Sequence, residues 1–268
     1  PEKITRKIAS IIKGGDSTRA NAVKSLGKMG SKAIPAAPWI TPLLTDKTSL
    51  MYIYIGSPQG GGGSRTTMGA VAGTALSRIF KGKPDALIAL YNRKDIANRT
   101  SLIPLLGTFN TPEANAVFAT GFTNSDEKIR AKTADAARNP HWKGELFKLL
   151  ASDPSQNVRN TAARALKRFV KDDGSDICEG FASYLFDKNS VVRNCAIEYM
   201  ARKKDPRGLK AIAKIISGSD SRGARDCAQF AFYYGGEGVK ILNDALKSKS
   251  GQALAILGSL SFSSRLVK

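Results

Sequence analysis

The sequence predicts an all-α fold, a right-handed α-α superhelix (solenoid) of about seven helix pairs. An arginine recurs at intervals close to the length of one helix pair, and small or apolar residues follow each arginine at helical spacing. No alternating apolar run suggests a sheet. A hydrophobic fraction of 42% in 268 residues is enough to bury a core.

The recurring arginines mark the first helix of each pair. After a first interval of 46 residues, they are separated by 29 to 34 residues. Intervals of this size are typical of stacked supersecondary units that bury their apolar faces only against their neighbours. The seven arginines are Arg19, Arg65, Arg99, Arg130, Arg159, Arg193 and Arg225.

The third, fourth and seventh residues after each arginine form the predicted buried stripe. In the fifth unit they are Ala162, Ala163 and Leu166, and in the sixth they are Ala196, Ile197 and Met200. Apolar residues at this spacing lie on one face of a helix. Because small residues dominate the stripe, neighbouring helices should approach closely.

A turn with capping residues precedes most first helices, and a second amphipathic helix follows each of them. Ser, Asp and Asn side chains accept hydrogen bonds from the exposed N–H groups of a first helical turn. The predicted caps are Asp16-Ser17, Ser125-Asp126, Asp153 to Ser155, Asp187 to Ser190 and Asp220-Ser221. The predicted second helices span Ile34 to Leu44, Asp85 to Tyr91, Glu113 to Phe122, Glu145 to Leu150, Ile177 to Phe186, Leu209 to Ile216 and Val239 to Leu246.

Residues 50–63 form an insertion between the first and second units. The segment from Met51 to Ile55 is either a short extended piece or a continuation of the preceding helix. The run from Gly60 to Gly63 should be flexible. No Gly-Lys-Ser/Thr follows it, so it is not a phosphate-binding P-loop. The insertion either carries function or is a tolerated surface loop.

The segment from Asp153 to Leu166 resembles the D-x-x-x-x-V-R-x-x-A-A-x-A-L core of HEAT repeats. The segment from Asp187 to Ala196 repeats the beginning of this pattern. The resemblance implies one HEAT-like solenoid over residues 1–268, with repeats from about 16 to 246 and caps at both ends. It also implies that the arginine-bearing helices line the concave side. Their arginines should pair with acidic turn residues of adjacent units, which makes those arginines structural.

The charge of the chain predicts either a polyanionic partner or a solvated, highly soluble surface that binds none. A formal charge of +20, from 42 Lys and Arg against 22 Asp and Glu, attracts polyanions. Positions beside the buried stripe place basic side chains on the expected concave face. We expect a non-enzymatic interaction scaffold that binds an acidic protein or a nucleic acid there. The candidate binding residues are Lys24, Lys28, Lys132, Arg138, Arg164, Lys167, Arg168 and Arg202.

The enzymatic alternative is a DNA glycosylase, because the chain is similar to the HEAT-like alkylpurine DNA glycosylases, which are basic solenoids. Trp142 and Asp135 could take the parts of that family's aromatic and acidic residues, with Arg164 or Arg168 on a phosphate. The family's active-site motif does not align with these positions. Nothing specific supports the bilin lyases, another HEAT-like class. The chain has one histidine, His141, which disfavours a hydrolytic triad.

Other sequence features limit cofactors and membrane association. Cys178, Cys195 and Cys227 show no metal-ligand spacing and cannot form a disulfide framework, so no metal or cofactor is expected. No apolar run is long enough to span a bilayer. The basic stretch from Lys3 to Lys13 is either an end cap or a helix on an anionic membrane. The chain begins at Pro1 and not at a methionine, so the question of a preceding segment stays open. The sequence indicates no cellular compartment.

Overall fold

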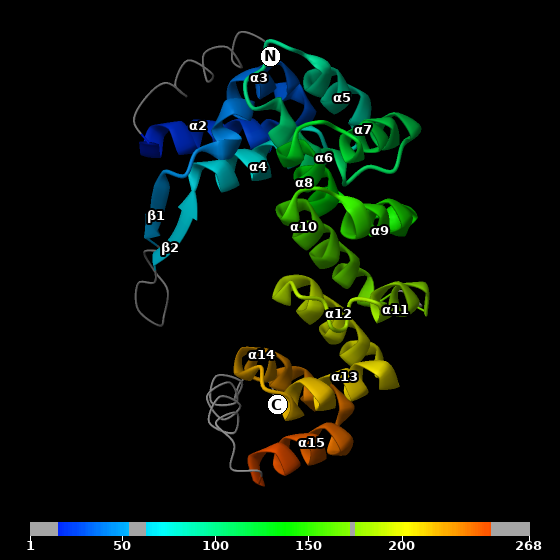
Figure 1. The fold of residues 1–268 in the computed structure, drawn as a ribbon. Helices are drawn as coiled ribbons and strands as arrows, with labels where there is room; N and C mark the ends of the chain where they lie inside the picture. Colours follow the sequence, from blue (N-terminus) through cyan, green and yellow to red (C-terminus); the bar gives the residue numbers. More distant parts are fainter. Residues whose placement is uncertain (1–15, 54–62, 172–174, 248–268) are drawn as a thin grey trace. The chain divides into compact units, whose positions relative to one another are not determined.

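The computed structural model describes residues 16–53, 63–171 and 175–247. The chain divides into two compact units, residues 1–137 and residues 138–268. Each unit is a stack of helices, which confirms the all-α prediction (Figure 1). One continuous solenoid through residues 1–268 stays a prediction. The stretch from Lys3 to Lys13, the run Gly60–Gly62 and the C-terminal cap lie outside the described residues.

The first unit contains helices and one β-hairpin. Its elements are α2 (Asp16–Met29), η1 (Gly30–Ala36), α3 (Ala37–Ile40), η2 (Thr41–Thr45), β1 (Ser49–Ile53), β2 (Gly63–Thr67), α4 (Met68–Ile79), α5 (Pro84–Asn92), η3 (Arg99–Leu102), α6 (Ile103–Leu106), α7 (Pro112–Phe122) and α8 (Glu127–Ala136). The expected helix from Ile34 to Leu44 is broken into short 3-10 and α segments. Prolines at 35, 38 and 42 explain the breaks, because each lacks the N–H that an uninterrupted helix needs.

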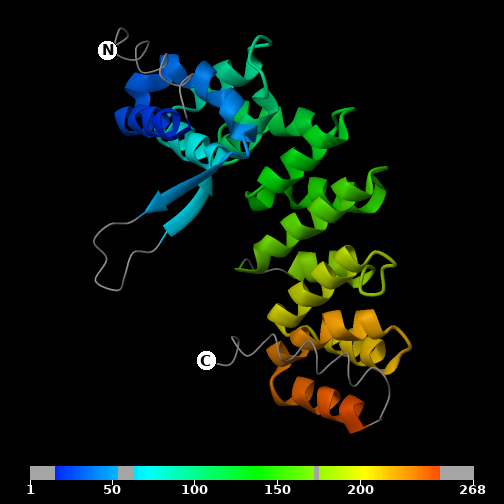
Figure 2. The same cartoon turned by 90° about the vertical axis from the view of Figure 1, so that its left-hand side faces the viewer.

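The hairpin corrects the expectation that the chain holds no sheet. Strand β1 pairs with β2 in antiparallel register, from Ser49 opposite Thr67 to Ile53 opposite Gly63. Of the two interpretations of Met51 to Ile55, the extended one is therefore right for the described residues up to Ile53. The ribbon projects from the helices of its unit (Figure 2). Its base is closed where Thr48 O accepts from Met68 N at 3.0 Å and Asp46 O accepts from Gly69 N at 2.9 Å.

The second unit is a stack of helix pairs. Its elements are η4 (Pro140–Trp142), α9 (Lys143–Ser152), α10 (Gln156–Lys167), η5 (Arg168–Lys171), α11 (Ser175–Ala182), α12 (Ser190–Lys203), α13 (Pro206–Ser217), α14 (Ser221–Ala231), η6 (Phe232–Tyr234) and α15 (Gly236–Lys247). Helix α12 packs against both α10 and α14, so these three form one layer. Helices α9, α11 and α13 lie on the other side of that layer (Figure 1).

The predicted stripe of small and apolar residues forms the core. Ala162, Ala163 and Leu166 of α10 are fully buried, as are the corresponding residues of α12. The small residues allow the predicted close approach. A Cβ atom at Gly27 of α2 would lie 2.9 Å from the Cα of Ala75 in α4. The predicted buried stripe is interrupted in α14, because Gln229, the fourth residue after Arg225, is exposed.

Most predicted caps are confirmed. The carboxylate of Asp126 accepts from the backbone of Lys128 at the start of α8, and that of Asp220 accepts from Gly223 in α14. At α12 the cap is Asn189, whose side chain accepts from Val191 N at 2.9 Å. At α10 the N-cap Ser155 makes no side-chain cap hydrogen bond.

Candidate functional site

The recurrent arginines of α8, α10 and α12 bind the turns that precede their own helices. Arg159 Nη1 donates to the carbonyl oxygen of Asp153 at 2.5 Å and to that of Pro154 at 3.1 Å. Arg130 Nη1 donates in the same way to two carbonyls of its turn, at 2.7 Å and 3.0 Å. Arg193 Nη1 donates to Asp187 O at 3.0 Å. These arginines therefore supply hydrogen bonds to carbonyl oxygens of their own turns.

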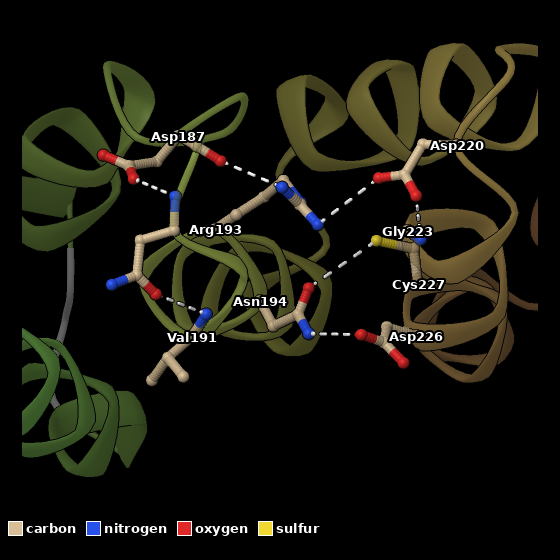
Figure 3. Close-up of polar contacts among 9 residues, drawn as sticks. Asp187, Val191, Arg193, Asn194, Asp220, Gly223, Asp226 and Cys227 are labelled. Carbon is tan, nitrogen blue, oxygen red and sulfur yellow. Dashed lines mark hydrogen bonds and ion pairs between the residues drawn. The ribbon is translucent and has the colours of Figure 1, made fainter.

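Two recurrent arginines also reach an acidic residue of the next turn, as the resemblance implied. Arg19 pairs with Asp46 at 2.9 Å. Arg193 Nη2 lies 3.7 Å from a carboxylate oxygen of Asp220, which also caps α14 (Figure 3). The carboxyl pKa of Asp46 is lowered, first by hydrogen bonds from Thr48 and also by Arg19. The structural role expected of the arginines is supported at these positions.

Three recurrent arginines depart from this role. Arg65 is exposed in strand β2 instead of lying on a helix, and Arg99 begins the 3-10 helix η3. Arg225 is exposed on α14, and the described residues give it no hydrogen bond or ion pair. The arginine repeat was therefore a correct guide to the spacing of the units but not to the local geometry of each one.

Polar side chains immediately after the arginines join neighbouring repeats. Asn189 Nδ2 donates to Asn160 Oδ1 at 2.8 Å, and Asn194 Nδ2 donates to Asp226 Oδ2 at 3.4 Å. The thiol of Cys227 lies 3.9 Å from Asn194 Oδ1 (Figure 3). Sequence reasoning missed these contacts. Their signal was a polar residue directly after the arginine in three successive units.

The candidate residues of the first unit differ in exposure. Lys28 is exposed near the end of α2, and Lys24 is half-buried. Lys132 is half-buried on α8, where its Nζ donates to Thr100 Oγ1 at 3.1 Å and to Ser101 Oγ at 3.3 Å. Burial lowers the pKa of the Lys132 ammonium group from its ordinary value of 10.5. Lys132 thus ties α8 to η3.

Arg138 does not lie on the helix that the sequence suggested. Helix α8 ends at Ala136, and Ala137 is its extended C-cap. Arg138 is therefore an exposed turn residue, and it belongs to the second unit. A basic ladder through every repeat stays a prediction.

The other four candidates come together in the second unit. Arg164 and Arg168 are exposed at the end of α10 and the start of η5. Lys167 Nζ pairs with Glu198 Oε2 at 2.6 Å, and Arg202 Nη2 pairs with Glu198 Oε1 at 2.7 Å. One carboxylate of α12 therefore holds cations from two successive repeats.

The layer of the second unit that carries these residues has a strong positive excess. Helices α10, α12 and α14 together with η5 contain ten Lys and Arg against two Asp and Glu. Helices α9, α11 and α13 contain five against three. The excess positive charge is thus concentrated on the layer that includes the arginine-bearing helices.

The aromatic residues near this layer serve mainly in packing. Tyr199 is fully buried. Tyr234 donates its hydroxyl to Asp205 O at 2.6 Å, and burial raises the pKa of that hydroxyl above its ordinary value. The guanidinium of Arg202 lies over the ring of Tyr233, 5.6 Å from its centroid.

The residues considered for glycosylase chemistry are divided between the two units. Trp142 is buried and meets the ring of His141 edge to face at 4.8 Å. The second tryptophan, Trp39, is 43% exposed in α3 of the other unit. These positions give the glycosylase alternative no support.

The cysteines of the described chain are buried thiols. Burial raises the pKa of Cys178 and Cys195, and it raises that of Cys227 to about 12. Such thiols stay protonated and poorly nucleophilic at neutral pH. Over residues 16–53, 63–171 and 175–247 there is no cluster of His, Cys, Asp and Glu that could hold a metal. No helix in these ranges is sufficiently long and apolar to cross a bilayer.

Comparisons with known proteins agree with this architecture. A sequence profile described as HEAT repeats matches residues 145–231. The crystal structure of the Escherichia coli protein YibA aligns with a TM-score of 0.53 and 20% identity, covering 96% of this chain and 90% of that one. The structure of Kap121p bound to Pho4p aligns with a TM-score of 0.60 and 13% identity, covering 96% of this chain and 33% of Kap121p. Curated proteins gave no sequence match. The described chain has an α-solenoid fold, and its residues 145–231 match the HEAT-repeat family.

Proposed function

We propose that this protein is a non-enzymatic interaction scaffold that binds an acidic segment of a partner protein on the layer formed by α10, α12 and α14. The charge difference between the two helix layers of the second unit carries this proposal. The helices of the proposed layer carry ten basic residues against two acidic ones, and eight basic residues remain when the turn-binding Arg159 and Arg193 are left out. A surface of one sign attracts an oppositely charged partner and accelerates its association.

The acidic residues of the second unit offset little of this charge. Most lie in turns or on the opposite layer, and they already have partners there. The carboxylates of Asp153, Asp187 and Asp220 accept from backbone N–H groups of their own turns. Glu198 is the one acidic residue on α12, and no acidic residue lies on α10 or η5.

Two observations favour a protein over a nucleic acid as the partner. HEAT repeats are typical of protein-interaction scaffolds, and the fold neighbour Kap121p was crystallised with another protein, Pho4p. Two aromatic residues near α12 offer little to a base, whereas Phe232 of η6 is 38% exposed. Tyr199 is buried, and one face of Tyr233 is covered by Arg202. Stacking on exposed aromatic rings contributes much of the affinity for single-stranded nucleic acid.

The proposal is tested by a charge reversal with a matched control. Arg164, Lys167 and Arg168 are changed together to Glu in the full-length chain. The control changes Lys148, Lys210 and Lys214 to Glu, which alters the net charge equally at exposed positions on α9 and α13 of the other layer. Binding of a short fluorescein-labelled peptide of alternating glutamate and glycine is measured by anisotropy.

The reversal on α10 and η5 should weaken binding about 10- to 100-fold, and the control should change it less than about 3-fold. Equal losses in the two variants would show only an effect of total charge and would overturn the proposed surface. A nucleic-acid function gives a different result. If about five basic side chains contact duplex DNA, log affinity falls against log salt with a slope of about −4 to −5. Tighter binding of an oligonucleotide than of the peptide at equal salt would favour nucleic acid.

A further inference from the structure

Four side chains from three successive repeats form a connected cluster on the proposed binding layer. They are Lys167 of α10, Glu198 and Arg202 of α12, and Tyr233 of η6. The two oxygens of the Glu198 carboxylate pair with Lys167 at 2.6 Å and with Arg202 at 2.7 Å. Arg202 in turn lies over the ring of Tyr233.

The cluster leaves positive charge facing outward. The Glu198 side chain is 14% exposed, whereas Lys167 is 31% and Arg202 is 41% exposed. Both carboxylate oxygens are occupied, so the group carries two positive charges and one negative charge. A lysine has three N–H donors and an arginine has five. Within the described residues, each cation uses donors only toward Glu198, so further donors are available to an incoming anion.

The arrangement also holds the two cations in place. Long basic side chains lose considerable rotamer freedom when they bind an anion, and that loss weakens binding. Here Glu198 limits the movement of Lys167 and Arg202 before any partner arrives, and the Tyr233 ring supports the planar guanidinium. Arginine in such a setting presents a rigid fork that matches a carboxylate.

We propose that Lys167 and Arg202 form a preorganised clamp for a carboxylate side chain of the partner, with Glu198 and Tyr233 as positioning residues. This inference rests on the proposed function. The existing ion pairs support the choice of ligand, because the two cations are already spaced to meet the two oxygens of one carboxylate.

Basic residues beside the clamp indicate where the rest of the bound partner segment would lie. Arg164 is three residues before Lys167 and four before Arg168, so its side chain neighbours each of them at the end of α10. The thiol of Cys195 on α12 lies beneath this region and is buried. Burial raises its pKa, and the nearby charges of Lys167 and Arg164 act against that rise.

Same-face residues on a helix are separated by about 5–6 Å, and alternate residues of an extended strand by about 6–7 Å. An extended segment could therefore place one carboxylate in the clamp and the next beside Arg164 and Arg168. The partner chemistry is an extended acidic peptide with carboxylates at alternate positions.

The clamp is tested with two conservative substitutions and the same glutamate–glycine peptide. Arg202→Lys keeps the charge but removes the planar fork, and it should weaken binding about tenfold. Glu198→Gln makes the surface more positive, so simple charge attraction predicts tighter binding. The clamp predicts binding that is about threefold or more weaker, because the two cations are no longer held. Thermal melting of each variant reports whether the fold is intact.

The outcomes separate the clamp from the proposed function. If the wild type does not bind the peptide, the proposed function fails. If it binds, but Glu198→Gln binds as tightly or more tightly and Arg202→Lys is unchanged, the clamp is wrong and the basic scaffold stands. Loss in both variants with unchanged melting supports the clamp. Preference for a single-stranded oligonucleotide over the peptide would overturn the carboxylate as ligand.

Discussion

The turn-binding role of the recurrent arginines predicts a measurable loss of stability when one is removed. Arg193→Met keeps an apolar stem of similar length but removes the guanidinium. Two interactions disappear, the hydrogen bond to Asp187 O at 3.0 Å and the ion pair with Asp220 at 3.7 Å. A hydrogen bond from a charged donor contributes about 1.5–3 kcal/mol. The Asp220 side chain is 58% exposed, so its ion pair adds about 0–1 kcal/mol.

The free energy of unfolding should therefore fall by about 2–3 kcal/mol in Arg193→Met, and most of the fall should come from the turn carbonyl. Urea unfolding followed by far-UV circular dichroism measures it. Arg225→Met is the matched control, because Arg225 holds the same repeat position yet is exposed and unbonded within the described chain. Its effect should be below about 0.5 kcal/mol.

A double-mutant cycle identifies the source of the loss. Asp220→Asn keeps an oxygen that can accept from Gly223 N and cap α14, and it removes the charge that Arg193 faces. The coupling energy between Arg193→Met and Asp220→Asn should be below about 1 kcal/mol. A coupling that accounts for most of the Arg193→Met loss would refute the assignment to the turn carbonyl. An effect equal to that of Arg225→Met would refute the structural role itself.

Three further predictions concern packing and pH. Gly238→Ala should destabilise the protein by about 2 kcal/mol or more in thermal melting, because its Cβ would overlap the backbone carbonyl of Ala231. Tyr234→Phe should cost about 1 kcal/mol in urea unfolding, since it removes the 2.6 Å hydrogen bond to Asp205 O. Hydrogen bonds from Arg207 lower the carboxyl pKa of Asp205 below its ordinary value of 3.8. The folded state therefore gains stability from this carboxylate above that pH and loses it as the pH falls further. Asp205→Asn should lower the free energy of unfolding at neutral pH. This loss relative to wild type should shrink in acid. A loss that stays constant with pH would contradict the assignment.

The sequence predicts the helix pairs well because each repeat buries the same positions. The stripe that includes Ala162, Ala163 and Leu166 is set by local helical spacing, and the caps depend on residues within one turn. A helix of four residues such as α6 is harder to foresee, because Pro104 and the flanking 3-10 turn shorten it. The hairpin was missed because its pairing joins residues that local periodicity does not connect.

The candidate site was predicted less completely than the fold. Positions past each arginine pointed to Arg164, Lys167 and Arg202, which lie on α10 and α12 of one layer, and their role in binding stays a prediction. The carboxylate between them was treated only as an interruption, whereas Glu198 holds two cations from successive repeats. Lys132 shows the opposite error, since its helix position suggested exposure but its ammonium group binds two hydroxyls. Such contacts depend on side-chain conformations between repeats, which spacing within one repeat does not determine.

The closed base of the hairpin makes the ribbon of β1 and β2 a side branch of the helical stack of the first unit. Backbone hydrogen bonds from Met68 and Gly69, the first residues of α4, join the two ends of the ribbon, and Arg19 holds Asp46 at the same place. Residues added between Ile53 and Gly63 would lengthen the branch while α2 and α4 keep their mutual packing. The stack can therefore tolerate length variation there, and a reporter or an affinity tag can be inserted at this point with little cost to the fold.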